Sequence, residues 1–131
     1  MKRFILEQSN DEFYTSHSGL ALVGACINHY SDLGRTLGRV GKGSEHITEI
    51  DIIRSYLGLL CLGKSDYQAI TAKWDDAYFK QALGISRIAS AERLRQRLDE
   101  AGAALIPVIV KGARTMLKRL NIPNSMLPQV V

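Results

Sequence analysis

The segment from Thr48 to Gly63 constrains the fold more than any other part of the chain. The Thr48 hydroxyl can accept a hydrogen bond from an unpaired amide at a helix start, and Glu49 and Asp51 complement the positive end of the helix dipole. Apolar residues then recur at spacings of three and four, as on one buried face: Ile50, Ile53, Leu57, Leu60 and Cys61. Gly63 suits the left-handed backbone that ends many helices. The pattern predicts an amphipathic core helix.

Two shorter helices are expected before this segment. Ser18 can cap the first, whose apolar positions also have helical spacing: Leu20, Val23, Ile27 and Tyr30. The second runs through Leu33 and Leu37 and should end in a glycine cluster, because glycine weakens a helix: Gly38, Gly41 and Gly43. The apolar run Phe4-Ile5-Leu6 favours a short N-terminal strand, although the rest of the chain does not obviously supply a sheet for it.

Short helices separated by polar turns are expected next. After a turn at Ser65-Asp66, a helix is predicted to run through three large side chains: Tyr67, Ile70 and Trp74. Asp75 or Asp76 should cap the following helix, which ends at Gly84 and carries Phe79 and Leu83. The capping role explains the acidic residues Asp66, Asp75 and Asp76 without catalytic chemistry, and no serine, cysteine or histidine triad is assignable.

Two further helices are predicted at the C-terminal end. Ser90 should cap a helix over 91–101, with Leu94 and Leu98 facing inward and Gly102 ending it. Pro107 fits the first turn of a separate final helix, whose apolar face is formed by Ile109, Ala113, Met116, Leu117 and Leu120. Polar and proline residues should terminate that helix, and Val130-Val131 should begin a strand: the terminating residues are Asn121, Pro123 and Pro128. The expected class is therefore mainly α, a compact helical domain.

Basic residues are concentrated in the second half of the chain. Residues 1–65 carry seven basic and seven acidic side chains, whereas residues 66–131 carry ten and six. The helices around 75–83 and 90–101 have the order of a helix-turn-helix, with a longer turn than usual. Arginine side chains suit both phosphates and guanine edges, so polyanionic DNA is the expected partner. The candidate DNA-contacting residues are Arg87, Ser90, Arg93, Arg95, Arg97, Lys111, Arg114 and Lys118.

Each basic group also has a simpler interpretation. Glu92, Asp99 and Glu100 could balance the arginines on a solvated helix face. Lys111, Arg114 and Lys118 fall at i, i+3 and i+7, which suits contacts with a phosphate backbone and equally an ordinary exposed face. Periodicity alone leaves these alternatives open.

Several other sites are excluded by their spacing. Residues 38–44 superficially resemble the Walker phosphate loop, but that motif needs a glycine where Thr36 stands and a hydroxyl residue where Gly43 stands. Cys26 and His29 form only half of a zinc site, and no cofactor is expected in this chain. Cys26 and Cys61 are expected to be buried and reduced. The 131 residues suit one domain, with no membrane span and no signal peptide, so we expect a cytoplasmic protein.

The chain resembles the thirteen-eighty family of insertion-sequence transposases, which belong to the DDE class with an RNase H-like catalytic domain. The resemblance covers nearly the whole chain and rests on the order and spacing of six segments: 15–22 (TSHSGLAL), 52–57 (IIRSYL), 63–67 (GKSDY), 76–84 (DAYFKQALG), 88–90 (IAS) and 94–98 (LRQRL). It implies that residues 1–131 form an N-terminal helical region that helps recognise the terminal inverted repeats of the mobile element.

The resemblance also implies a catalytic domain that uses three acidic residues and a divalent metal. Its first aspartate would lie on a strand beginning near Val130-Val131, so no catalytic residue is assigned and the chain is expected to be inactive alone, as a fragment or truncated product. Two alternatives stay open. The helix faces could serve protein–protein assembly, as a homo-oligomer or an inhibitory module, or the chain could be a free-standing transcription regulator.

Overall fold

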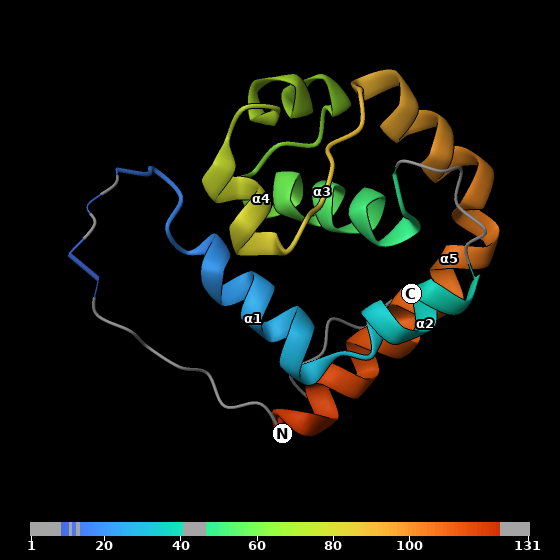
Figure 1. The fold of residues 1–131 in the computed structure, drawn as a ribbon. Helices are drawn as coiled ribbons and strands as arrows, with labels where there is room; N and C mark the ends of the chain where they lie inside the picture. Colours follow the sequence, from blue (N-terminus) through green and yellow to red (C-terminus); the bar gives the residue numbers. More distant parts are fainter. Residues whose placement is uncertain (1–8, 11, 13, 41–46, 124–131) are drawn as a thin grey trace.

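Helices account for all the regular secondary structure in the part of the chain that the computed structural model describes, residues 9, 10, 12, 14–40 and 47–123 (Figure 1). The elements are α1 (Leu20–Tyr30), α2 (Leu33–Val40), α3 (Glu49–Cys61), the 3-10 helix η1 (Tyr67–Lys73), α4 (Ala77–Leu83) and α5 (Ala91–Arg119). The mainly α class is confirmed. Several predictions lie outside the described residues: the strand at 4–6, Gly41, Gly43, Pro128 and Val130-Val131.

Helix α3 begins and ends as its local sequence predicts. Thr48 Oγ1 accepts a hydrogen bond from the Asp51 amide at 3.2 Å, and the Asp51 carboxylate accepts one from the Thr48 amide at 3.5 Å. These reciprocal bonds satisfy two of the amides that a helix start leaves unpaired. Gly63 has φ +70°, and the following Lys64 amide donates to the Leu59 carbonyl at 2.9 Å. Gly63 therefore closes the helix through the left-handed backbone expected of it.

The buried surface of α3 differs from the single face predicted for it. Leu60 and Cys61 are exposed, so their predicted burial is wrong. Instead α3 contributes to two clusters of buried residues. The first cluster contains Ile52 and Leu59 of α3 together with Ile70, Phe79, Leu83 and Leu94. The second cluster contains Ile53 of α3 together with Ile27, Leu33, Leu37 and Leu105. A helix covered from two sides buries a different and wider surface than one amphipathic stripe, so the single predicted face did not include Ile52 and Leu59.

The N-terminal helix α1 is also present, but its predicted cap is wrong. Gly19 occupies the N-cap position, and no side chain makes a capping hydrogen bond there. The Ser18 carbonyl instead accepts a 2.6 Å hydrogen bond from the Tyr78 hydroxyl of α4. A tertiary contact therefore holds the start of α1. Of the two cysteines, Cys26 is half-buried rather than fully buried, and both are free thiols.

Between α3 and the end of α4, the helix caps and the helix ending form at residues that the sequence predicts. Asp66 accepts from the Gln68 amide at 3.0 Å and starts η1, which is a 3-10 helix. Asp76, rather than Asp75, caps α4 by accepting from the Phe79 amide at 2.9 Å. Gly84, at φ +65°, ends α4 as predicted. Trp74 follows η1 and stays 46% exposed, while Ile70 is fully buried.

The largest correction concerns the C-terminal helices. Residues 91–119 form one helix, α5, which passes through Gly102 and Pro107, so the predicted break and restart are wrong (Figure 1). Proline inside a helix costs about 3 kcal/mol. The carbonyl that Pro107 leaves without a helical amide belongs to Ala103, which is exposed, so water can bond to it.

Packing on both sides of Pro107 keeps α5 continuous. Leu94 and Leu105 are buried before it, and Gly112 after it lies so close to Leu33 that an added Cβ would be 2.9 Å from Leu33 Cδ2. In the predicted apolar face, Ala113 and Leu120 are exposed, whereas Ile109, Met116 and Leu117 are half-buried. Asn121, at φ 53°, ends the helix as predicted, with the Ile122 amide donating to the Leu117 carbonyl at 3.1 Å.

Candidate nucleic-acid interface

The connection between α4 and α5 is held firmly against the core. Ile85 and Ala89 are buried, and the Ser86 amide donates to Asp51 Oδ1 of α3 at 2.9 Å. Arg54 of α3 donates to the Leu83 and Gly84 carbonyls at 2.9 and 3.0 Å, and its partial burial lowers the pKa of its guanidinium. These contacts fix where α5 begins, and with it the first arginines of the predicted DNA-binding helix.

A helix-turn-helix pairing of α4 and α5 is not confirmed. Residues 84–90 connect the helices, whereas the motif uses a turn of about three or four residues. Helix α4 packs chiefly on α1, and α5 packs on η1, α1, α2 and α3. Recognition by α5 would therefore depend on its own exposed surface rather than on a standard two-helix unit.

The first turns of α5 place the predicted residues in different environments. Ser90 Oγ accepts from the Arg93 amide at 3.2 Å, so its hydroxyl caps the helix. Arg93 and Arg95 are exposed, and Arg95 forms a 3.5 Å ion pair with Asp99. Arg97 pairs with Glu49 of α3, and both side chains are largely buried. The structure thus joins Arg97 to α3, whereas Arg93 and Arg95 face solvent.

Helical periodicity decides which basic residues share a side of α5. At 3.6 residues per turn, Arg93 and Lys111 are separated by about five full turns and lie on the same side of the helix. Lys118 lies about 20° from that direction and Arg114 about 60°, whereas Arg95 is about 160° away. Arg97 also lies only about 40° from Arg93, but its guanidinium is paired with Glu49 and largely buried. The exposed basic side of α5 therefore consists of Arg93, Lys111, Arg114 and Lys118. Arg93 and Lys111 are about 27 Å apart along the axis, most of the roughly 34 Å of one DNA turn.

One basic residue of α2 lies next to the C-terminal part of the basic side of α5. Lys111, Arg114 and Lys118 are exposed, and none forms an ion pair within the described residues. Arg35 of α2 lines the same 240 Å³ hollow as Lys111. Arg35 was not predicted as a site residue, because no sequence pattern links residues that are 76 positions apart. Arg35 and the neighbouring Arg119 are both held by Asp32, at 2.7 and 3.2 Å.

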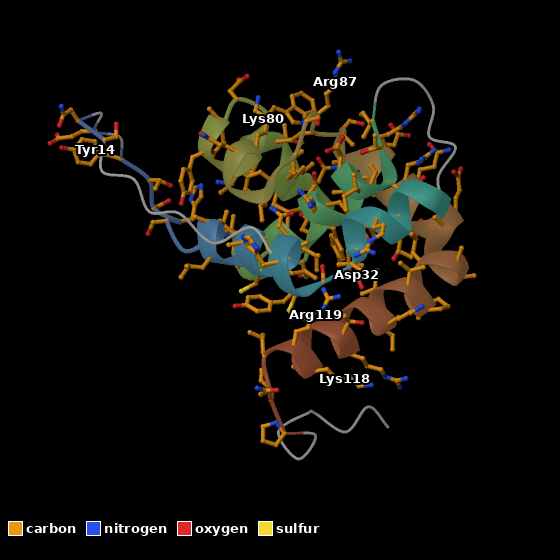
Figure 2. The ribbon with its side chains drawn as sticks, turned by 60° about the horizontal axis from the view of Figure 1, so that its bottom comes forward. Tyr14, Asp32, Lys80, Arg87, Lys118 and Arg119 are labelled. Atoms are coloured by element: carbon orange, nitrogen blue, oxygen red, sulfur yellow. The ribbon has the colours of Figure 1, made fainter. Side chains whose placement is uncertain are left out.

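Arg87 lies apart from this C-terminal group. Figure 2 shows its side chain pointing away from the helices at one end of the molecule, near Lys80, whereas Lys118 lies at the opposite end. Arg119 points toward Asp32 in the same view, in agreement with their ion pair. The eight predicted residues therefore do not form one patch. Arg87, Ser90, Arg93 and Arg95 lie toward one end, Lys111, Arg114 and Lys118 lie toward the other, and Arg97 is paired with Glu49.

A serine–histidine–aspartate chain was not foreseen from the sequence. Ser16 Oγ lies 3.0 Å from His17 Nδ1, and His17 Nε2 lies 2.9 Å from Asp76 Oδ2. Lys73 Nζ also contacts Asp76 Oδ2, at 3.2 Å. This residue order is that of a hydrolase triad. However, one Asp76 oxygen already caps α4, the other is shared with an ammonium group, and Ser16 is exposed. The cluster, here called the His17–Asp76 clasp, fastens the segment before α1 to α4.

Asp76→Asn should weaken this clasp. Burial alone would raise the pKa of the Asp76 carboxyl, but hydrogen bonds from Phe79, Lys73 and His17 outweigh it and hold the pKa below its ordinary value of 3.8. A lowered folded-state pKa stabilises the fold above pH 3.8, and this stabilisation is lost as the pH falls further. We expect Asp76→Asn to lower the free energy of unfolding by about 1–2 kcal/mol at pH 7, measured by urea unfolding, and this loss should shrink as the pH falls below 3.8.

Asp75→Asn is the matched control for this change. Asp75 is exposed and does not cap α4, so its replacement should alter stability by less than about 0.5 kcal/mol. An equal effect of the two substitutions at pH 7 would contradict the role assigned to the clasp.

Among the described residues, no group of three or more histidine, cysteine, aspartate or glutamate side chains is placed to hold a metal ion. No helix in that part of the chain is long and apolar enough to cross a membrane. No family model matches the chain, and searches of curated proteins and of solved structures likewise find no match.

Proposed function

We propose that this chain is the DNA-binding part of a DDE transposase and recognises the terminal inverted repeats of an insertion sequence in the cytoplasm. The observation that carries the proposal is the basic side of α5, where Lys111, Arg114 and Lys118 are exposed without ion pairs among the described residues. Basic residues spaced along a rigid helix can follow a phosphate backbone and orient the protein on DNA.

The resemblance to insertion-sequence transposases supplies the specific substrate. Arg93 and Arg95, exposed near the start of α5, are the proposed readers of base edges, and Arg87 extends the same end of the molecule. Arg97 remains a proposed reader, although reaching DNA would require its guanidinium to leave Glu49. Strand transfer would need the acidic residues and divalent metal that the resemblance assigns to a separate catalytic domain.

Binding of two DNA duplexes of equal length tests the proposal. One carries an inverted repeat from the DNA that flanks the coding sequence, and the other is its scrambled counterpart. We expect fluorescence anisotropy to show about tenfold or greater preference for the repeat, because each specific arginine contact contributes about 1–3 kcal/mol. Alanine at Arg93 and Arg95 should remove the preference, while alanine at Arg87 should have a smaller effect. Equal affinity for the two duplexes would refute recognition of the repeats.

A further inference from the structure

The C-terminal half of α5 exposes apolar residues on a side that the domain does not use for its core. Ile106 is 62% exposed, Val110 43% and Leu120 37%, and Ala103 and Ala113 are also exposed while Leu117 is half-buried. These six residues are Ala103, Ile106, Val110, Ala113, Leu117 and Leu120, and they are here called the α5 seam. Their spacings are three, four, three, four and three, the alternation of the a and d positions of a coiled coil. Ala103, Val110 and Leu117 hold the a positions, and Ile106, Ala113 and Leu120 hold the d positions.

The α5 seam is distinct from both other sides of the helix. At 3.6 residues per turn, its mean direction lies about 120° from that of the buried Leu105 and Gly112, so the domain body extends away from anything packed on the seam. Lys111 and Lys118 lie roughly 120° from the mean direction of the seam on the other side. The seam is bounded on its N-terminal side by Gln96 and Asp99, where the same heptad positions become polar.

We infer that the α5 seam binds the α5 seam of a second copy of this chain, in antiparallel orientation. In an antiparallel pair each a residue faces a d residue of the partner. Ala103 would then face Leu120 of the second copy, Val110 would face Ala113, and Ile106 would face Leu117. Small residues meet larger ones in two of these three kinds of layer, as close packing requires. A parallel pair would instead place Ala103 against Ala103 and Ala113 against Ala113, leaving gaps.

The charged residues beside the seam fit the same arrangement. Residues 103–120 include four basic side chains and no acidic one. A second copy carries the same positive charges, so the two helices can pair only where these side chains do not face one another. The antiparallel pair places Arg114, at an e position, opposite Pro107 of the second copy rather than opposite another cation. On the other flank Ile109 faces Met116, and both are apolar. The seam is therefore complementary to itself, as a two-fold symmetric interface must be.

The length of the seam indicates a weak dimer. It spans about two and a half heptads, roughly 27 Å, which is short for a free-standing coiled coil. Here α5 is already folded against α1, α2 and α3, so pairing does not have to nucleate the helix. If the proposed DNA binding is correct, the pair also places Lys111, Arg114 and Lys118 of both copies on one side, because e positions face one another in antiparallel coiled coils. The dimer itself does not depend on that function.

Sedimentation velocity of the full chain without DNA tests the dimer. The mass should rise from 14.5 kDa toward twice that value as the concentration increases, with a Kd of order 10 µM. Val110→Glu should raise the Kd about a hundredfold or more, because its carboxylate would enter two central layers of the interface. Ile106→Gln should raise it about tenfold. Lys111→Glu adds the same charged group on the adjacent exposed side, and should leave the Kd within about twofold.

Far-UV circular dichroism should show equal helix content for these variants, since all three positions are exposed. A monomer at all concentrations up to roughly 500 µM, or a dimer unaffected by Val110→Glu and Ile106→Gln, overturns the inference. These outcomes are measured without DNA, so they are distinguishable from a failure of the proposed function.

Disulfide trapping tests the orientation. In a chain with Cys26→Ser and Cys61→Ser, the Ala103→Cys and Leu120→Cys variants are oxidised separately and then as a mixture. The antiparallel arrangement predicts a cross-link between the two different variants, because residues 103 and 120 face each other across the interface. Cross-linking of each variant to itself, with none between the two, would show a parallel pair and overturn the antiparallel assignment.

Discussion

A chain with alanine at Lys111, Arg114 and Lys118 is expected to bind duplex DNA about a hundredfold more weakly near 0.15 M salt. Each phosphate contact that is lost removes close to 0.9 from the slope of log affinity against log salt concentration, so the slope should become shallower by about 2.7. The three side chains are exposed, and folding should be unaffected. Anisotropy titrations between about 0.05 and 0.3 M salt measure both quantities. The affinity for specific and scrambled duplexes should fall together, since phosphate contacts do not read sequence.

Lys64→Ala is the charge control for this experiment. Lys64 is exposed beyond the end of α3 and does not belong to the basic side of α5. Its removal lowers the net charge by one, so it should change the slope by less than about 0.3 if only direct contacts matter. An unchanged slope in the triple variant would show that this side of α5 does not contact the phosphate backbone.

Gly24→Ala is expected to destabilise the fold by about 3 kcal/mol. A Cβ at Gly24 of α1 would lie 1.8 Å from the Ala82 carbonyl oxygen and 2.9 Å from the Ala82 carbonyl carbon of α4. Both atoms belong to the backbone, so relief requires the two helices to separate, which disturbs the burial of Leu20 and Leu83. Urea unfolding measures the change in the free energy of unfolding. A loss below about 1 kcal/mol would show that α1 and α4 are not in close contact there.

Gly102→Ala provides the opposite expectation from the same type of substitution. Gly102 lies within α5, and a Cβ there would meet nothing within 4 Å. Alanine should therefore stabilise the fold by about 0.5–1 kcal/mol through its higher helix propensity. A glycine with left-handed backbone at a helix end would give destabilisation instead, so this control also tests whether α5 is continuous.

Local sequence was sufficient to predict most helix boundaries. The caps at Thr48, Asp66, Asp76 and Ser90 depend on a side chain and an amide two or three residues away, and all four form as expected. The endings at Gly63, Gly84 and Asn121 likewise depend on the backbone preference of one residue. The exposure of the basic side of α5 was also predictable, because helical spacing separates Lys111, Arg114 and Lys118 from the apolar positions.

Tertiary structure decided the features that depend on distant residues. Gly102 and Pro107 favour a break locally, but the packing of Leu105 and Gly112 against the second core cluster keeps one helix of 29 residues. The same fold turns Arg97 toward Glu49, brings Arg35 beside Lys111 and joins His17 to Asp76 across 59 positions. Local preferences amount to about 1–3 kcal/mol at each position, and burial of several side chains together can exceed them. The sequence by itself therefore determined where helices start and which faces are charged, whereas long-range packing determined their length, their second buried faces and the partners of their side chains.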